Sequence, residues 1–505
     1  MSHPIPLQQN NESARRKYVP THGVFESTLA CNLRCRHCGS SAGQARSDQL
    51  DTAECQRLFG ELKSLGLKRL TISGGEPTTR PDWARLIELC TDVQLKVSMF
   101  TNAVTLTDDD IRKAKDNGLA SLAFSLDGLE ATHDHIRGKK GHFKILQQAM
   151  DSCRRIDMPF AVVSTLCNDN ISQLRALHQF VADQGAYAWQ VQPGNKMGNL
   201  SHHPELHLSQ RALPRIEQIL AELMVVHPLK VLPGDSLGYF GPNDKIIRRN
   251  CGGAFGGCGA GIHTIGIECN GNIKGCLSIL PGYNHSGGDF VEGNIRDTPL
   301  AEIWHREDAF AATRKWQPAD LSGFCSSCEH ANQCRGGCLG KRITDGTPSE
   351  NTMCTWRVLA ESNESSPKIA KAASLFFAAS LASTGMVSCS DSDDPVPLYA
   401  APPVTEPEEE DETETEDTET DTETGTETDT MRDSETGTET DTETDTSDSE
   451  MMMPIYSTPD VEPDTSDSEM MVPVYSSPDV EPDTSDSEMM VPVYSAPDVE
   501  PDTSD

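Results

Sequence analysis

Short apolar runs alternate with longer amphipathic stretches from Val24 to Val226. The short runs are typical of buried strands, and the longer stretches repeat their apolar residues every three or four positions, as one face of a helix does. The predicted strands are Val24–Leu29, Arg69–Ser73, Lys96–Thr101, Ser121–Ser125, Phe160–Leu166 and Ala188–Gln192. The predicted helices pass through Glu54, Leu58 and Leu62 and then span Trp83–Leu89, Ile111–Asn117, Phe143–Ile156, Ile171–Gln184 and Leu213–Val226. Six such units predict an α/β fold, a partial (β/α)6 barrel.

Composition divides the chain into five segments. Residues 1–20 are polar, and we expect a flexible N-terminus. The barrel pattern occupies residues 21–235, and residues 236–360 are rich in Gly and Cys, which predicts a small second domain. Residues 361–389 contain a basic start, an apolar middle and small residues before Cys389, so this segment is either leader-like or an amphipathic helix. Residues 390–505 contain tracts of Thr, Glu and Asp that lack apolar residues to bury, which predicts a disordered acidic tail.

Charge and cysteine content narrow the partners and the compartment. The tail holds 39 acidic residues against one basic residue, Arg432, while the rest of the chain is nearly neutral. No basic stripe with interleaved aromatic residues is present, so we expect no nucleic-acid partner. The N-terminus has no apolar signal core and residues 368–389 are short for a membrane span, so we expect a cytoplasmic protein without stable membrane insertion. In a reducing cytoplasm, the clustered cysteines among the seventeen indicate metal ligands rather than disulfides.

Candidate chemistry follows the predicted strands. Cys31, Cys35 and Cys38 form a CxxxCxxC run after the first strand, and three thiolates directed to one point leave one metal coordination position free. A zinc site short of one ligand remains the alternative. The other motifs at strand ends are Gly74-Gly75-Glu76-Pro77, Thr101-Asn102 and Ser125-Leu126-Asp127-Gly128, with Gln190 and Gln192 on the sixth strand. Each alone is an ordinary turn or cap, but parallel strands bring their carboxyl ends to one rim.

CxxxCxxC after the first strand with GGEP after the second resembles the radical S-adenosylmethionine (SAM) enzymes. The resemblance implies a 4Fe-4S cluster on Cys31, Cys35 and Cys38, whose open iron binds the amino and carboxylate groups of SAM. It also implies cofactor contacts at Gly74, Gly75, Glu76, Asn102 and Ser125. The glycines allow backbone close to the cofactor, Glu76 accepts from its ammonium group, and Asn102 and Ser125 hold its carboxylate or ribose. Reductive cleavage of SAM then gives a 5′-deoxyadenosyl radical that abstracts hydrogen from a substrate.

A second group of cysteines has spacing typical of metal sites. It comprises Cys251, Cys258, Cys276, Cys325, Cys328, Cys334, Cys338 and Cys354. Eight thiolates make two sets of four, and spacing alone leaves zinc and iron-sulfur open.

The pattern GX4C…CX2CX5CX3C…C, starting at Gly271, resembles the SPASM extension of peptide-modifying radical enzymes such as anaerobic sulfatase maturases. The resemblance implies two auxiliary clusters, one on Cys251, Cys258, Cys276 and Cys338, the other on Cys325, Cys328, Cys334 and Cys354. We expect Cys55, Cys90, Cys153, Cys167 and Cys269 to be free and buried.

The tail carries a 19-residue repeat centred on tyrosine. MMMPIYST, MMVPVYSS and MMVPVYSA place Tyr456, Tyr475 and Tyr494 at equal intervals, and PLYAAP around Tyr399 is an imperfect copy. Repeats this short do not fold as a solenoid. About 120 residues separate Cys354 from Tyr475, and a flexible chain of that length spans roughly 60 Å, enough to reach the barrel of the same molecule.

These features favour a radical SAM peptide or protein maturase that modifies the tyrosine repeats of its own tail, supplied with electrons by a flavodoxin or ferredoxin. The repeats can instead be a docking motif or products of slippage. One alternative function is a sulfatase-maturase-like oxidation of a separate protein in trans. Another is a non-catalytic zinc-binding scaffold with an acidic interaction tail. Asp127, Asp235 and His263 are candidates for a general base.

Overall fold

The computed structural model of the chain describes residues 18–234, 237–253, 255–279 and 290–364. All of them belong to one compact unit, Met1–Asp411. The predictions for the N-terminal segment up to residue 17, for Asp235, and for residues 365–505 with their four tyrosines lie outside the described residues.

A ten-stranded sheet forms the centre of the described structure, in the order β10-β9-β8-β1-β2-β3-β4-β5-β6-β7. Seven strands follow the chain and pair in parallel: β1 His22–Glu26, β2 Arg69–Ser73, β3 Lys96–Thr101, β4 Ser121–Ser125, β5 Phe160–Leu166, β6 Ala188–Pro193 and β7 Lys230–Pro233. Consecutive parallel strands place their carboxyl ends along one rim, with Glu26 beside Ser73 and Leu166 beside Pro193. The motifs that follow these strands therefore meet at that rim.

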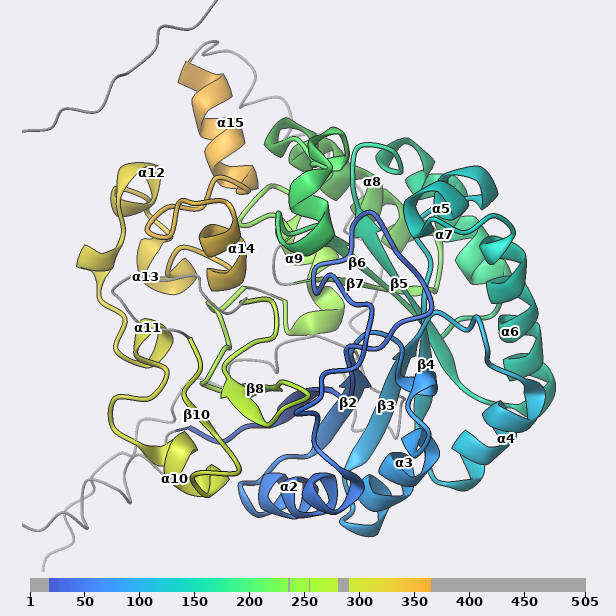
Figure 1. Cartoon of the computed structure of the whole chain (residues 1–505). Coiled ribbons are helices and arrows are strands. Elements are labelled where there is room, and N and C mark those ends of the chain that lie inside the picture. Colours follow the sequence, from blue (N-terminus) through green and yellow to red (C-terminus); the bar gives the residue numbers. More distant parts are fainter. Residues whose placement is uncertain (1–17, 235–236, 254, 280–289, 365–505) are drawn as a thin grey trace, which may run out of the picture. The chain divides into compact units, whose positions relative to one another are not determined.

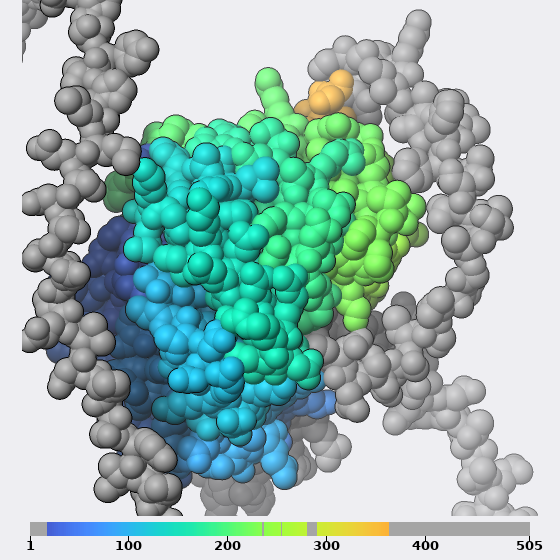
Figure 2. Space-filling view, turned by 90° about the vertical axis from the view of Figure 1, so that its right-hand side faces the viewer, coloured from blue at the N-terminus to red at the C-terminus, as the bar shows by residue number. Residues whose placement is uncertain are grey.

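Helices cover the outer face of the curved sheet (Figure 1). Figure 2 shows the surface of the molecule on the right-hand side of Figure 1, coloured by residue number. They are α2 Thr52–Ser64, α3 Trp83–Asp92, α4 Asp108–Asp116, α5 Glu130–Arg137, α6 His142–Ile156, α7 Leu174–Asp183 and α8 Leu213–Val226. The helix α2 shows how the sequence forms them: Asp51 and Glu54 make a capping box, and the buried Leu58, Phe59 and Leu62 face the sheet. Phe59 meets Phe25 of β1 edge to face at 5.7 Å. This architecture confirms the predicted partial barrel.

The structure adds elements that the apolar pattern missed. Helix α5 has the sequence EATHDHIR, in which only His133 and Ile136 are buried, so no apolar periodicity marks it. Strand β7 has four residues and extends the sheet beyond the sixth strand. At the opposite edge, β8 Thr264–Ile267 pairs in parallel with β1, so a strand from the C-terminal region continues the barrel sheet.

The C-terminal region consists mostly of short elements (Figure 1). They are β9 Asn272–Lys274, β10 Gly293–Asn294, α9 Asp244–Ile247, α10 Leu300–His305, α11 Ala311–Arg314, α12 Gly323–Ser326, α13 Ala331–Cys334, α14 Leu339–Thr344 and α15 Thr355–Glu364. Polar contacts join this region to the barrel, since Thr355 donates to the buried Glu217 of α8. The predicted division at residues 235/236 thus falls within one packed unit. No helix among the described residues is long and apolar enough to cross a membrane.

Candidate active site

Two cavities adjoin at the carboxyl ends of the strands. The first, of about 260 Å³, is lined by Cys31, Cys35 and Cys38 together with other predicted site residues, Gly74, Gly75, Glu76, Asn102 and Ser125. The second, of about 250 Å³, is lined by Cys258, Cys276 and Cys338 of the C-terminal region. The two cavities share His37, Gly74 and Gln192, among others. The fold therefore brings the first three cysteines and part of the second group to the two sides of one hollow.

Gly74 and Gly75 are needed where the loop after β2 crosses the chain that leads into the cysteine loop. Gly74 has φ +139°, and a Cβ there would lie 2.3 Å from the carbonyl oxygen of Thr28. A Cβ on Gly75 would lie 2.1 Å from the carbonyl oxygen of Ala30. The Gly75 and Glu76 amides donate to those same two oxygens, at 2.7 and 2.8 Å. Both positions thus need glycine for a close approach to neighbouring backbone, and the predicted approach to the cofactor stays a prediction.

Glu76 fixes the end of β3. Its carboxylate is buried and accepts from the Thr78 hydroxyl at 2.7 Å, the Thr101 hydroxyl at 2.8 Å and the Asn102 amide at 2.7 Å. Burial raises the pKa of Glu76, and these hydrogen bonds oppose the rise. Glu76 therefore orients Asn102 as well as lining the first cavity.

The Asn102 side chain contacts the cysteine loop. Its amide nitrogen donates to the Asn32 side-chain oxygen at 2.8 Å and lies 3.9 Å from the Cys31 sulfur, and its oxygen accepts from the Val104 amide. Both polar atoms of the Asn102 side chain thus have partners within the protein. The predicted contact of Asn102 with the carboxylate or ribose of SAM stays a prediction.

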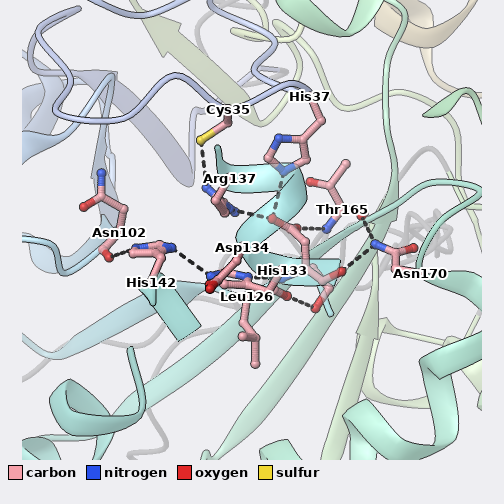
Figure 3. Close-up of polar contacts among 12 residues, drawn as sticks. Cys35, His37, Asn102, Leu126, His133, Asp134, Arg137, His142, Thr165 and Asn170 are labelled. Carbon is pink, nitrogen blue, oxygen red and sulfur yellow. Dashed lines mark hydrogen bonds and ion pairs between the residues drawn. The ribbon is translucent and has the colours of Figure 1, made fainter. Parts of the chain in front are cut away.

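Asp127 is a buried acceptor rather than a free base. Its carboxylate accepts from Arg137 Nε at 2.6 Å, His37 Nε2 at 2.9 Å and the Thr165 amide at 2.9 Å (Figure 3). Burial alone would raise the pKa of Asp127, but the charges of Arg137 and His37 outweigh it and hold the pKa well below its ordinary value. Such a carboxylate is a poor proton acceptor near neutral pH. His263, another candidate, is not among the residues that line the two cavities.

The first cavity offers a donor set suited to an iron-sulfur cluster. Arg137 Nη1 lies 3.8 Å from the Cys35 sulfur, so two of the three thiols have an N–H group directed at them. Burial raises the pKa of Cys35 to about 11, and Arg137 opposes that rise. The buried Nδ1 of His37, between Cys35 and Cys38, has no hydrogen-bond partner within the described ranges. Thiols with N–H donors and an uncommitted polar atom at the cavity wall fit a bound cluster and a polar ligand.

The C-terminal cysteines gather in two places. Cys325, Cys328, Cys334 and Cys354 line one small cavity with Tyr239 and Trp356, which matches one of the two predicted sets. Burial raises the pKa of Cys334, and the neighbouring Cys354 and Cys325 raise it further. Of the other set, Cys258, Cys276 and Cys338 share the second cavity, and Cys251 packs against small residues inside the barrel. No three His, Cys, Asp or Glu side chains of the described residues stand close enough to share a single metal ion, so the ligand assignments stay predictions.

Five cysteines expected to be free are buried and unbridged. They are Cys55, Cys90, Cys153, Cys167 and Cys269. Burial raises the pKa of the Cys269 thiol to about 12, and the nearby Glu26 adds to the rise. These residues behave as small apolar side chains, as predicted.

Three features together define a class: an open α/β barrel, three thiols at its rim, and a cysteine-rich extension that shares the hollow. They are those of an iron-sulfur enzyme with a second, cysteine-bearing region. Comparison with known proteins gives the family. Residues 25–181 match the model of the radical SAM superfamily, and residues 258–329 match that of the SPASM iron-sulfur cluster-binding domain.

Relatives of known name cover most of the described chain. An AdoMet-dependent heme synthase of Methanosarcina barkeri is 30% identical over 62% of this chain and 89% of its own length. The mycofactocin maturase MftC of Mycolicibacterium smegmatis is 30% identical over 64% of this chain and 79% of its own. The crystal structure of Streptococcus suis SuiB bound to S-adenosylmethionine shares the fold, with a TM-score of 0.55 at 17% identity over 68% of this chain and 80% of that one. The chain belongs to the radical SAM superfamily and is an enzyme whose cofactors are 4Fe-4S clusters and SAM.

Sequence reasoning missed two features of this site. Arg137 and the histidines of α5 and α6 lie on a polar helix and at a helix start, where no strand-end motif marks them. The SLDG motif pointed to Asp127 but not to its partners, of which Arg137 is ten residues further along the chain.

Proposed function

We propose that this radical SAM enzyme modifies a peptide, with the radical cluster held by Cys31, Cys35 and Cys38. The arrangement that supports this is the pair of adjoining cavities, one lined by these three cysteines and the other by cysteines of the SPASM region. A substrate in the second cavity would lie between the radical source and an auxiliary cluster. When bound, the radical cluster and SAM supply the hydrogen-abstracting radical.

The protein side chains then have separate roles in this proposal. Gly74, Gly75 and Glu76 hold the loop after β2 against the cysteine loop, and Asn102 and Ser125 border the cavity in which SAM would bind. Cys325, Cys328, Cys334 and Cys354 hold one auxiliary cluster, and Cys258, Cys276 and Cys338, with Cys251, hold the other. The barrel spans residues 21–235 and the SPASM domain residues 236–360. An external flavodoxin or ferredoxin is the electron donor.

The substrate class comes from the chain itself rather than from its relatives. One relative is named a heme synthase and another a mycofactocin maturase, so membership of the superfamily leaves the substrate open. A structural neighbour, SuiB, is described in complex with the precursor peptide SuiA. In this chain, the repeats around Tyr456, Tyr475 and Tyr494 present one tyrosine-centred segment several times. A peptide maturase acting on these repeats accounts for both halves of the sequence.

The same site allows a second function, an oxidation of a separate protein in trans. The observation that favours it is the fold shared with anSMEcpe, described with bound AdoMet and the Cp18Cys peptide, at a TM-score of 0.52 and 15% identity. That likeness concerns the fold alone, so the cis proposal takes precedence because its peptide is part of the same chain.

Anaerobic reconstitution with iron and sulfide tests the cofactor assignment. We expect about twelve irons per chain, four for each of three clusters, and reductive cleavage of SAM by dithionite or flavodoxin. Cys35→Ala should abolish the cleavage and leave the iron of the auxiliary clusters. Zinc in place of iron, or full SAM cleavage in Cys35→Ala, would contradict the assignment.

Mass spectrometry of the tail tests the substrate. The reconstituted full chain is incubated with SAM and reductant and digested, and the fragments that bear Tyr399, Tyr456, Tyr475 and Tyr494 are weighed. A mass change in these fragments that is absent without SAM, and absent in Cys35→Ala, supports modification of the tail. Mixing active enzyme with a Cys35→Ala chain carrying a mass label separates cis from trans. Unchanged tail masses with activity toward an added protein would favour the second function.

A further inference from the structure

A continuous hydrogen-bonded chain of residues joins two of the three rim cysteines. It runs from Cys31 to Asn102, then through His142 and His133 to Asp127, and from there through Arg137 to Cys35. Figure 3 shows the part of it from Asn102 to Cys35. The N–H···O and N–H···N hydrogen bonds along this chain have donor–acceptor distances of 2.6 to 3.1 Å. The contacts to sulfur measure 3.9 Å at Cys31 and 3.8 Å at Cys35.

The partners of the two histidines fix their protonation. His142 Nε2 donates to the Asn102 carbonyl oxygen, so His142 Nδ1 is the acceptor for His133 Nε2. His133 Nδ1 in turn accepts from the Asp127 amide. Each ring therefore accepts at Nδ1, donates at Nε2 and is neutral. The rings stack with centroids 4.8 Å apart, and both residues are fully buried. This arrangement holds Asn102 and Asp127 at fixed positions. It thereby also fixes the two N–H donors directed at the cysteines, the Asn102 side-chain amide and the Arg137 guanidinium.

The charged end of the chain lies at Cys35. Asp127 is fully buried and the Arg137 side chain is 11% exposed, so water screens their charges weakly. Arg137 places Nε on Asp127 and Nη1 toward the sulfur of Cys35, which is the most buried of the three cysteines. His37, two residues from Cys35, accounts for a second contact to the same Asp127 oxygen.

We propose that Arg137 and Asp127 are positioning residues that set the reduction potential of the radical cluster through Cys35, Arg137 raising it and Asp127 lowering it. The proposal rests on the assignment of Cys35 as a cluster ligand. Reduction adds one electron, so a cation and an N–H group at the thiolate stabilise the reduced form, while a nearby carboxylate destabilises it. Asn102 acts on Cys31 in the same direction as Arg137 but without charge.

The barrel contains a matched arrangement that lacks a proposed ligand. Arg80 pairs with Asp82, Nε to carboxylate oxygen at 2.6 Å, and its Nη2 lies 3.7 Å from the sulfur of Cys55. Cys55 lies on the buried face of α2 and belongs to no predicted metal set. An Arg–Asp–Cys contact is therefore not in itself a sign of a cluster, and the pair at Arg80 provides a control with nearly the same geometry.

A redox titration of the reconstituted full chain, followed by electron paramagnetic resonance of the reduced cluster, tests the proposal without any peptide. The auxiliary signals are separated by repeating the titration in Cys35→Ala, which lacks the radical cluster. The variants are Arg137→Lys, Arg137→Met and Asp127→Asn, with Arg80→Met and the exposed Arg112→Met as controls that also remove one positive charge.

We expect the potential of the radical cluster to fall in Arg137→Met, to fall less in Arg137→Lys, and to rise in Asp127→Asn. Both controls should keep the wild-type value. Opposite shifts from two residues that contact each other would not arise if the pair were merely structural, because either loss would then perturb the site alike. If Arg137→Met assembles no cluster, the proposal is tested by the other two variants: the reduction potential should be highest in Asp127→Asn, intermediate in the wild type and lowest in Arg137→Lys.

Two results would overturn the proposal. One is a potential in the Arg137 variants at or above the wild-type value, or a fall in Asp127→Asn. The other is an equal shift in Arg80→Met, which would show that the effect is not local to Cys35. A wild-type chain that binds no radical cluster is a different outcome, since it would remove the proposed function itself.

Discussion

Cys31, Cys35 and Cys38 lie on one loop after β1, whereas the eight C-terminal cysteines are spread over short helices and turns between Cys251 and Cys354. The first loop is held by the regular barrel: the Gly75 and Glu76 amides bind it from β2, and Asn102 reaches it from β3. The second region has few backbone ladders: β8 pairs with β1 of the barrel, β9 pairs with β8, and β10 pairs with β9. The barrel thus fixes the loop of Cys31, Cys35 and Cys38 without any metal, whereas the C-terminal cysteines have fewer backbone hydrogen bonds around them to fix their positions.

The comparison predicts different losses when one cysteine is removed from each region. Cys35→Ala should abolish SAM cleavage, because loss of a proposed cluster ligand should cost more than the roughly hundredfold that loss of a residue contacting a ligand can cost. Cys334→Ala should keep most of the SAM cleavage but lose about four irons, because Cys334 lines the separate small cavity with Cys325, Cys328 and Cys354. High-pressure chromatography of 5′-deoxyadenosine and iron analysis measure both. Equal loss of cleavage in the two variants would show that the regions are not separable.

The buried carboxyl group of Glu217, at the contact between the regions, should make the free energy of unfolding depend on pH. Burial raises the pKa of Glu217 to about 7, against its ordinary value of 4.5, and Thr355 opposes the rise. The folded chain therefore holds this proton more tightly than the unfolded chain. The stabilisation is fully present below about pH 4.5 and is lost as the pH rises to about 7, a loss of about 3 kcal/mol.

Glu217→Gln keeps the shape of the side chain and removes the titration. Thermal melts of the reconstituted chain should show little difference between wild type and variant at pH 5. At pH 8 the variant should be the more stable of the two, because it does not carry a buried charge. A wild type that is more stable than the variant at pH 8 would mean that the carboxylate is ionised and well paired in the fold.

A methyl group at the crossing of the two loops should disturb the radical site alone. Gly75→Ala places a Cβ 2.1 Å from the Ala30 carbonyl oxygen, and overpacking of this kind costs about 1 to 3 kcal/mol. We expect a higher KM for SAM and unchanged iron in the auxiliary clusters. Gly60→Ala is the control, since a Cβ there meets nothing within 4 Å and Gly60 lies within α2. It should stabilise the chain slightly, by about 0.5 to 1 kcal/mol.

More of the structure could be predicted from the sequence for the barrel than for the C-terminal region, and the reason is physical. Strands β2 to β5 were predicted at their observed bounds because each is an apolar run bounded by polar residues. The strand-end rule then placed the cysteine loop, Glu76 and Asn102 at one rim. The contacts of Asp127 were beyond this reasoning, because its partners Arg137, His37 and Thr165 meet only in the folded barrel.

For the C-terminal region, the spacing of the cysteines was informative, whereas the periodicity of apolar residues was not. The spacing and the family resemblance grouped Cys325, Cys328, Cys334 and Cys354, and the structure brings these four to one cavity. The pairing of β8 with β1 was not predictable, since Thr264–Ile267 is four residues long and its partner strand is about 240 residues earlier in the chain.

The smallest expected effect separates the buried cysteines of the barrel from the two groups proposed to bind metal. Cys153 lies on the inner face of α6 with no exposed surface, and burial raises its pKa to about 12, so it is a thiol packed as an apolar group. Cys153→Ala should leave iron content and SAM cleavage at wild-type levels and lower the stability by about 1 kcal/mol, as is usual for loss of one buried atom. Iron analysis and a thermal melt on the same preparation check both values. A loss of about four irons in Cys153→Ala would place this residue among the ligands and remove the distinction between buried and metal-binding cysteines.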